Sequence, residues 1–272
     1  MRPLLAAVLG VLALLATARV VLGDEGAATL LAEGTKALHD GRASDAIAAF
    51  EALADQGVVD PVASYDRGLA YAERVRIGAE VPGDLGRAAH GFEEARDLTR
   101  DPKLADDATQ ALTILRSEVA RRRTQAGQSV EVDPGRSLLR TVAGLLAEDT
   151  WAILAILASA TLSMGLFTRW RTTTPRLRIA AGVAAGLAAP LLLIAIVMTL
   201  SARHDRLDLR EAIVVSPSAR PSDEHGLVAP GATPLPEGAR VELVEDRATW
   251  TRVRFGAHDA WVPTSALREL AR

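Results

Sequence analysis

The sequence predicts a multi-domain chain with three structured parts: an all-α helical repeat, a two-helix transmembrane hairpin and a small all-β barrel. Three observations predict this organisation. Two long stretches in the middle carry no charged residue, two glycines upstream stand at the spacing of a helical repeat, and short apolar runs downstream are separated by turn residues. The uncharged stretches organise the rest of the chain, because they separate the repeat from the barrel.

The two uncharged stretches are residues 150–168 and 179–202, which contain no Asp, Glu, Lys, Arg or His. As helices with a rise of about 1.5 Å per residue, they are about 28 Å and about 36 Å long. The hydrocarbon core of a bilayer is about 30 Å thick, so each stretch predicts a transmembrane helix, the second one tilted. The alternative is a buried hairpin in a soluble core, which is disfavoured because soluble helices rarely run this far without a charge on any face.

The loop between the two stretches, residues 169–178, is strongly basic. It contains no acidic residue and four arginines, namely Arg169, Arg171, Arg176 and Arg178. Short basic loops stay on the cytoplasmic side of a membrane. The sequence therefore predicts a multi-pass protein of the bacterial cytoplasmic membrane, with this loop inside and the N- and C-terminal domains extracytoplasmic.

Small residues line one face of each predicted span. Gly182 and Gly186 form a G-x-x-x-G pair on the second span, and Ala155, Ser159 and Ser163 recur at helical spacing on the first. Small faces let transmembrane helices pack closely. Contact between these two helices is the simpler interpretation, and an interface with a second copy of the chain is the alternative.

Composition excludes several function classes. The net charge of −3 gives no case for a nucleic-acid partner. The chain has no cysteine, which excludes disulfides, thiol catalysis, thiolate zinc sites and a lipoprotein anchor. No H-E-x-x-H, G-x-S-x-G or G-x-x-x-x-G-K-[ST] motif occurs, and no two histidines stand three or four residues apart. The sequence therefore predicts a protein that is not an enzyme, with no catalytic residues, no cofactor and no metal site.

The N-terminus, residues 1–23, has the pattern of a secretory signal peptide. Arg2 precedes an apolar run over residues 4–18, and small residues follow it. Cleavage after Ala18 or after Gly23 fits this pattern, and an uncleaved anchor is the alternative. Both send the next segment across the membrane, in agreement with the predicted topology of the hairpin.

Residues 27–124 carry the marks of a helical repeat. Gly34 and Gly68 are 34 residues apart, and an Ala-x-x-x-Phe pattern follows each, ending at Phe50 and Phe92. Glycine lets two helices approach closely, and phenylalanine fills the space between successive hairpins. The pattern resembles two tetratricopeptide (TPR) units with a closing helix over residues 102–124. An ordinary helical bundle is the alternative, because two units are fewer than the roughly three that a stable solenoid needs.

Two Asp-Pro pairs mark helix starts in this region. Asp60-Pro61 and Asp101-Pro102 each have the pattern of an N-cap followed by proline at the first helical position. Residues 74–85 hold about eight residues more than the corresponding part of a TPR unit, so this segment is expected to be an insertion between two helices.

The resemblance to TPR units implies a peptide-binding groove formed by the first helix of each unit. The positions that match this groove are Leu31, Thr35, Leu38, Tyr65 and Leu69, with His39 and Glu73 beside them. They lack the Lys/Asn set with which some TPR proteins bind a terminal carboxylate. The resemblance therefore implies a protein partner that is bound largely through apolar side chains.

Residues 125–149 connect the repeat to the hairpin as a linker followed by an interfacial amphipathic helix. Asp133-Pro134 starts the predicted helix, and its apolar residues recur at i, i+3, i+4 and i+7. A short amphipathic helix next to a span is typical of the membrane interface. Packing of this helix on the repeat is the alternative.

The tail, residues 211–270, is predicted to be β. Several short apolar runs separated by turns within about sixty residues favour a small barrel. The order of marks resembles a bacterial SH3-like domain: Glu237-Gly238, then Trp250-x-x-Val253, then Trp261-Val262. Trp250 and Trp261 are candidate binding residues on this domain, and a structural role for both is the alternative.

The order of signal peptide, TPR units, two spans with a basic loop and SH3-like barrel resembles the BatE proteins of the bacterial aerotolerance (Bat) operon. This resemblance implies a non-enzymatic membrane scaffold for extracytoplasmic protein–protein interactions in envelope or oxidative stress. It implies membrane-anchored von Willebrand factor A-type Bat proteins and a MoxR-type ATPase as partners. The alternative function is a cell-wall-binding sensor whose SH3-like domain binds peptidoglycan.

Overall fold

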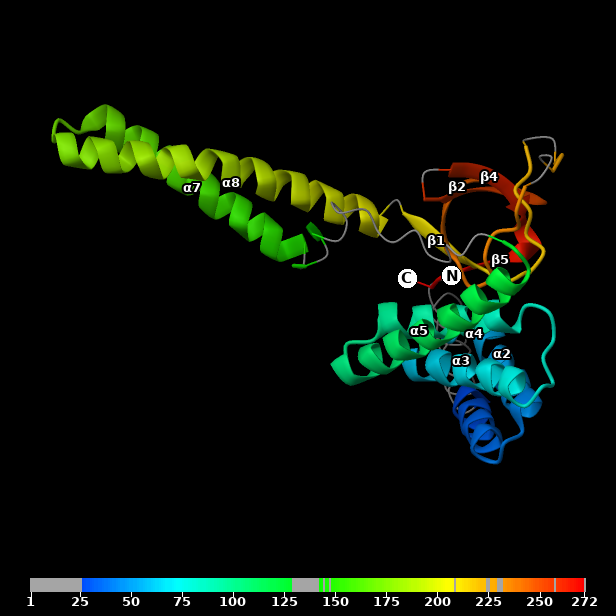
Figure 1. The fold of residues 1–272 in the computed structure, drawn as a ribbon. Helices are drawn as coiled ribbons and strands as arrows, with labels where there is room; N and C mark the ends of the chain where they lie inside the picture. The colour runs from blue at the N-terminus through cyan, green and yellow to red at the C-terminus, as the bar shows by residue number, and fades with distance from the viewer. Residues whose placement is uncertain are drawn as a thin grey trace, which may run out of the picture. The chain divides into compact units, whose positions relative to one another are not determined.

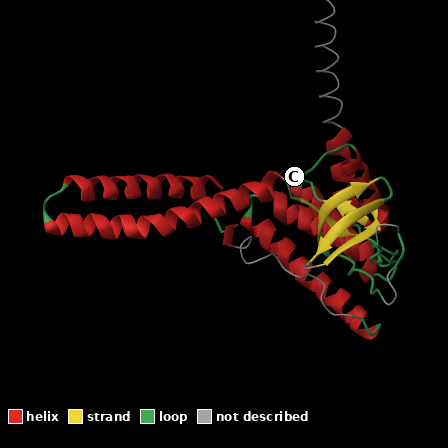
Figure 2. Ribbon diagram, turned by 90° about the horizontal axis from the view of Figure 1, so that it is seen from above, coloured by secondary structure: helices red, strands yellow, loops and turns green. Residues whose placement is uncertain are grey.

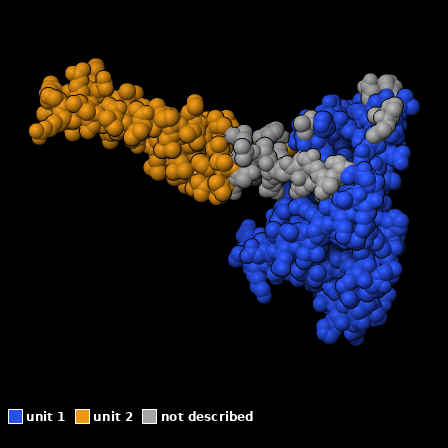
Figure 3. Space-filling view, viewed as in Figure 1, with its two compact units in different colours: residues 1–133, 210–272 blue, residues 134–209 orange. Residues whose placement is uncertain are grey.

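A computed structural model describes residues 26–128, 142–143, 145–146, 148–207, 209–223, 226–228, 232–256 and 258–271, without the side chains of residues 204–207. The chain divides into two compact units, residues 1–133 with 210–272 and residues 134–209 (Figure 3). The predicted signal peptide and most of the predicted interfacial helix lie outside the described residues.

The helical layer of the first unit begins with helical residues 26–39. Four further helices follow: α2 (Ala43–Asp55), α3 (Pro61–Arg76), α4 (Asp84–Leu98) and α5 (Pro102–Gln125) (Figure 1). From α2 to α5, each helix packs against the next one. Both predicted N-caps are confirmed, since the Asp60 carboxylate accepts the Val62 and Ala63 N–H groups at 2.9 Å and Asp101 accepts that of Lys103 at 3.0 Å.

One contact between glycine and phenylalanine occurs twice in this layer. A Cβ atom at Gly34 would lie 2.8 Å from the Phe50 ring, and one at Gly68 would lie 2.8 Å from the Phe92 ring. Both rings are almost fully buried. The close approach of the helices therefore requires glycine at both positions, which is what the 34-residue spacing predicts.

Helix α4 is the central element of the first unit, because it contacts α3, α5 and strand β1 (Arg210–Val214). Every residue from 84 to 95 except Arg87 is buried. Two glycines make room on opposite sides: a Cβ at Gly91 would lie 2.6 Å from the Ser64 carbonyl on α3, and one at Gly86 would lie 2.5 Å from the Val214 carbonyl on β1. Both the helical layer and the sheet therefore pack directly on the backbone of α4.

The tail forms one antiparallel sheet of five strands in the order β4-β3-β2-β1-β5 (yellow in Figure 2). The strands that follow β1 are β2 (Arg240–Arg247), β3 (Trp250–Phe255), β4 (His258–Pro263) and β5 (Leu267–Glu269). The three-residue 3-10 helix Thr264–Ala266 joins β4 to β5. The turn before β2 contains Gly238 at φ 77°, the left-handed conformation that favours glycine.

The prediction of an SH3-like barrel is wrong, because this sheet is open. Strands β4 and β5 lie at its two ends, and no pairing joins them among the described residues. The reason lies in the last residues of the chain. The Ala271 N–H donates to the Glu94 carboxylate on α4 at 3.3 Å, and the Leu270 side chain enters the helical core. The segment that could extend β5 toward closure is thus bound to the helices.

Strand β1 is buried on both faces. Ala212 and Val214 belong to the apolar core of the sheet, whereas Ile213 belongs to the core of the helical layer. A continuous apolar run is typical of such a strand, since neither face meets water. The observed fold of the first unit is therefore a helical layer joined to a small open sheet through β1.

The second unit is a hairpin of α7 (Glu148–Arg171) and α8 (Pro175–Leu207), which run side by side in both ribbon views (Figures 1 and 2). Both helices are long and apolar enough to cross a membrane. Their large apolar side chains are mostly exposed, as Ile156 (67%) and Leu187 (69%) show. A core helix of a soluble protein would be mostly buried, so this exposure favours a membrane environment.

The two helices approach each other closely at Gly165 of α7. A Cβ at Gly165 of α7 would lie 2.9 Å from the Ala181 carbonyl and 3.0 Å from the Ala185 Cβ of α8. Nothing lies within 4 Å of a Cβ at Gly186, and one at Gly182 meets only the Arg169 side chain. Gly182 thus faces a side chain of α7, whereas the alanines of α8 make the close contact with Gly165; the role of the G-x-x-x-G pair stays a prediction.

Candidate functional site

The predicted groove residues lie on two neighbouring helices, residues 26–39 and α3. Four of them are half-buried and pack against the helical core, namely Leu31, Leu38, Tyr65 and Leu69. The fifth, Thr35, is exposed, and its hydroxyl lies 3.5 Å from Asp66 Oδ2. We call these five residues the Tyr65 face; their role in binding stays a prediction.

Tyr65 connects this face to the core and to two acidic groups. Its ring meets the buried Phe92 ring at a tilt, with centroids 5.5 Å apart. Burial raises the pKa of the Tyr65 hydroxyl, and the nearby carboxylates of Asp107 on α5 and Asp66 on α3 raise it further. The Tyr65 face is thus apolar with acidic neighbours, a combination that complements apolar and basic side chains.

The two tryptophans of the sheet already have neighbours within the chain. Trp261 is buried, and the Arg247 guanidinium lies 4.2 Å from its ring centroid. Trp250 is half-buried, and a Cβ at Gly226 would lie 3.0 Å from its ring. These contacts stabilise the sheet, and a ligand-binding role for either ring stays a prediction.

Sequence reasoning missed a layer of buried charge between the helices and the sheet. Glu93 on α4 is fully buried and is paired with Arg96 of the same helix, Arg116 of α5 and Arg240 of β2. Arg116 Nη2 donates to Glu93 Oε1 at 2.6 Å, and Arg240 Nη1 donates to Oε2 at 2.8 Å. The one local pattern that could have indicated this layer is the pair of adjacent glutamates, Glu93 and Glu94, in a helix rich in Ala and Gly.

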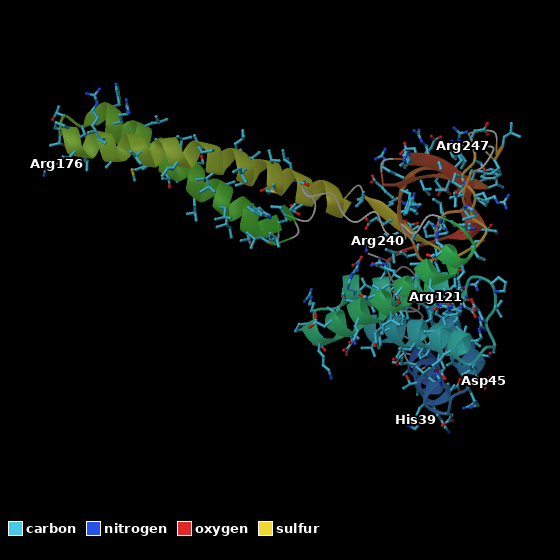
Figure 4. All side chains as sticks on the ribbon, in the orientation of Figure 1. His39, Asp45, Arg121, Arg176, Arg240 and Arg247 are labelled. Carbon is cyan, nitrogen blue, oxygen red and sulfur yellow. The ribbon has the colours of Figure 1, made fainter. Side chains whose placement is uncertain are left out.

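Arg240 is the link from this layer to the sheet (Figure 4). Besides Glu93, it binds Asp97 of α4 at 2.6 Å and Glu211 of β1. Burial alone would lower the pKa of Arg240, but Asp97, Glu211 and Glu93 together raise it. The guanidinium therefore stays charged in the interior and joins two strands to α4.

A second polar cluster joins α3 and α4 to the end of the chain. Glu94 accepts hydrogen bonds from Ser64 Oγ and Arg67 Nη2, both at 2.7 Å. Burial would raise the pKa of Glu94, but His90, Arg67 and Ser64 lower it below its ordinary value. Because Glu94 also accepts the Ala271 N–H, one carboxylate links two helices with the C-terminal segment.

Both ring nitrogens of His90 are occupied in this cluster. Nδ1 lies 3.1 Å from Arg67 Nη2, and Nε2 lies 2.9 Å from the carbonyl oxygen of Glu269. A guanidinium only donates and a carbonyl only accepts, so the neutral tautomer with its proton on Nε2 satisfies both partners. Burial lowers the pKa of His90 to about 4; the Glu94 carboxylate opposes this shift and the Arg67 charge adds to it.

Arg268 of β5 pairs with a carboxylate of the helical layer at the edge of the sheet, as Arg240 does from β2. It donates to the Glu51 carboxylate of α2 through two hydrogen bonds of 2.9 Å and 2.6 Å. Arg240 and Arg268 both pair in register with Ile213 of the strand between them. The three residues therefore form one row across β2, β1 and β5 that faces the helices, with a cation on each side of a buried isoleucine.

No protein-family model, curated protein or solved structure matches this chain. The resemblances to TPR units and to BatE proteins therefore rest on its own residues. Within the ranges that the structure describes, no group of three or more His, Asp or Glu side chains is placed to hold a metal ion.

A cavity of about 460 Å³ lies between the loop before α4, the end of α5 and the turn before β2. Arg122 on its wall pairs with Glu80 at 2.7 Å, and Arg123 donates to the Pro234 carbonyl at 3.0 Å. Glu237 Oε1 accepts the Gly86 N–H at 2.9 Å, and burial raises the pKa of that carboxyl. These contacts join the predicted insertion to α5, and they join α5 and α4 to the segment before β2.

Proposed function

We propose that this protein is a membrane-anchored scaffold whose first unit binds other proteins outside the cytoplasm. The observation that carries the proposal is the combination of two apolar, mostly exposed helices with a unit whose helices and sheet are fastened together by buried charge. Such a unit presents a fixed surface to a partner. Its buried histidine and carboxylates are engaged in holding the fold, which suits a binding role.

In this proposal the hairpin spans the bacterial cytoplasmic membrane, and both of its flanking segments lie outside. The four arginines of residues 169–178 support this topology, because basic loops of this length are retained in the cytoplasm. The first unit contains residues from before and after the hairpin, and two spans return the chain to the side from which it entered. The topology therefore puts the described residues of the first unit on one side of the membrane.

The partner contact in this proposal is the Tyr65 face. Leu69 and Tyr65 are half-buried, and further burial of such a side chain contributes about 1.5–3 kcal/mol at most. Asp66 and Asp107 beside Tyr65 favour a partner segment with basic groups among its apolar residues. The resemblance to BatE proteins supports membrane-anchored von Willebrand factor A-type Bat proteins as partners, with a MoxR-type ATPase, in envelope or oxidative stress.

The alternative, a cell-wall sensor, depended on an SH3-like barrel. The sheet is open, so this support for the alternative is lost. The Trp261 ring is buried, and the half-buried Trp250 ring already packs against the chain at Gly226. One function is therefore proposed.

Charge reversal at Asp107 tests this function. The full-length chain and its Asp107→Arg variant are co-expressed with a von Willebrand factor A-type Bat protein and co-purified from membranes. We expect the variant to retain about tenfold less partner, because a cation then faces the basic partner segment. The matched control is Asp106→Arg, an exposed neighbour on the same helix that should retain the partner. Equal binding by all three chains, with unchanged circular dichroism, would remove the Tyr65 face from the proposal.

A further inference from the structure

A groove of about 500 Å³ runs along one flank of the α7–α8 hairpin, at the end that carries the basic loop. Its wall is almost entirely small or apolar, and includes Thr161, Met164 and Gly165 of α7 and Ala180, Ala181 and Ala184 of α8. Small side chains keep the groove open, since a leucine at any of the three alanines would fill part of it.

The length of the groove matches one leaflet of a bilayer. Its lining extends from Thr168 back to Ala160 on α7 and from Leu177 to Ala184 on α8. At about 1.5 Å per residue these segments are about 12 Å and about 10 Å long. Half of the hydrocarbon core is about 15 Å, so the groove runs from the loop through most of the adjacent leaflet.

The mouth of the groove is strongly cationic. Four arginines lie within the ten residues of the loop, and the chain has no acidic residue between Asp149 and Asp205. In the part of the hairpin that the structure describes, none of the four arginines forms an ion pair. Figure 4 labels Arg176 at the tip of the hairpin. Because no carboxylate of the described hairpin pairs with these four arginines, they favour an anion that another molecule supplies.

The four arginines divide between the two flanks of the hairpin. Residues three or four apart share one face of a helix. Arg171 follows Thr168 of the groove by three residues, and Arg176 precedes Ala180 by four. The other two belong to the opposite flank. The Arg169 guanidinium lies where a Cβ at Gly182 would be 2.5 Å away, and Arg178 precedes Gly182 by four residues.

We propose that this groove binds one anionic phospholipid, with an acyl chain between the helices and the headgroup phosphate at Arg171 and Arg176. The inference rests on the proposed function, because it needs the hairpin to span a membrane. Guanidinium groups bind phosphate through paired hydrogen bonds, and basic pockets between spanning helices on the cytoplasmic side bind anionic headgroups. A second copy is a poorer occupant, because it would bring four more arginines to the same place.

The test is a lipid titration of the full-length protein, followed by native mass spectrometry, with phosphatidylglycerol compared with phosphatidylcholine. We expect a phosphatidylglycerol adduct that survives removal of bulk lipid and that inorganic phosphate does not displace. Arg171→Gln with Arg176→Gln should weaken phosphatidylglycerol binding by about thirtyfold, since each arginine near an anionic lipid contributes about fivefold. The matched control removes the same charge from the other flank: Arg169→Gln with Arg178→Gln should weaken it less than about threefold.

A second pair of variants tests the shape of the groove without changing charge. Ala184→Leu fills the groove and should abolish preferential retention of phosphatidylglycerol. Ala189→Leu adds the same side chain at an exposed position outside the groove and should leave retention unchanged.

Several outcomes overturn the proposal. If both double arginine variants lose phosphatidylglycerol binding equally, the arginines attract the membrane surface without a specific site. If phosphatidylcholine is retained as well as phosphatidylglycerol, the groove does not distinguish the headgroup. Dimers that form without bound lipid would assign the groove to a second copy. In each case, retention of the protein in membranes after alkaline carbonate extraction leaves the proposed scaffold standing. Release by carbonate would remove both the anchor and the lipid site.

Discussion

Replacing Arg240 with methionine tests whether buried charge holds the sheet on the helices. The Arg240 side chain is 13% exposed, and it binds Glu93 at 2.8 Å, Asp97 at 2.6 Å and also Glu211. Removing one partner of a buried ion pair costs about 3–5 kcal/mol. Glu93 keeps Arg96 and Arg116 in the variant, so we expect a loss near the lower end, about 3 kcal/mol.

The matched control is Arg121→Met on α5, which is also labelled in Figure 4. The Arg121 side chain is 58% exposed and pairs with Glu118 on the same helix. An exposed pair of this kind contributes about 0–1 kcal/mol. The two variants thus make the same chemical change, one at the boundary with the sheet and one at the surface.

The assay is thermal unfolding of the full-length protein in lipid nanodiscs, followed by circular dichroism and by tryptophan fluorescence. In a unit of this size, Tm falls by about 2–4 °C for each kcal/mol, so Arg240→Met should lower it by about 6–12 °C. Adding Glu93→Gln to Arg240→Met should cost less than the sum of the two single changes, because the two groups are in contact. If Arg240→Met unfolds within about 2 °C of Arg121→Met, the charge layer does not hold the sheet and the reasoning fails.

The first unit should lose stability in mild acid. The folded pKa of His90, about 4, lies below its unfolded value near 6.5, so the unfolded chain binds more protons in this range and stability falls on the order of 3 kcal/mol as the pH drops from 6.5 to 4. Arg67, Glu94 and Arg268 are the charged groups around the His90 ring. The pKa values of Glu94 and Glu51 are lowered in the folded protein, so protonation of these carboxylates adds to the loss of stability below about pH 4.5. His90→Gln, which can donate to the Glu269 carbonyl and accept from Arg67, should unfold with a flatter pH dependence above pH 5; an unchanged slope would assign the effect to other groups. For the topology, a reporter that is active only in the cytoplasm should be inactive when fused after Arg272 and active when inserted in the loop 172–174, and activity at Arg272 would contradict the proposed orientation.

The sequence predicted the features that depend on local patterns. The uncharged stretches correspond to α7 and α8, the Asp-Pro pairs cap α3 and α5, and Gly34 and Gly68 lie against Phe50 and Phe92. Each of these follows from a rule that acts within a few residues or within one helical repeat. Strand positions in the tail were predictable for the same reason, since alternation and turn residues are local.

Features that depend on distant partners were not predictable from a single sequence. Glu93 and Arg240 are 147 residues apart, and Glu51 and Arg268 are 217 apart. The local sequence around one residue of such a pair therefore does not indicate its partner. The open sheet could not be predicted for the same reason, because it also depends on a contact between distant segments. Whether β5 closes a barrel depends on where the last residues bind, and that is decided by Glu94 on α4.

The position of the buried charges explains why an apolar contact alone would not fix the sheet on the helices. Strand β1 is apolar at Ala212, Ile213 and Val214, and the residue that follows it is Val215. A slip of the sheet by two residues against the helices would therefore put Val215 in place of Ile213 at a small loss of buried area. Arg240 and Arg268 flank Ile213 on the two neighbouring strands, and each binds a different helix, α4 and α2. A slip would move both guanidinium groups away from their carboxylates at once, and an unpaired buried charge costs several kcal/mol. The ion pairs therefore select one register among several that the apolar residues would accept, and this is the property that a scaffold with a fixed binding surface needs.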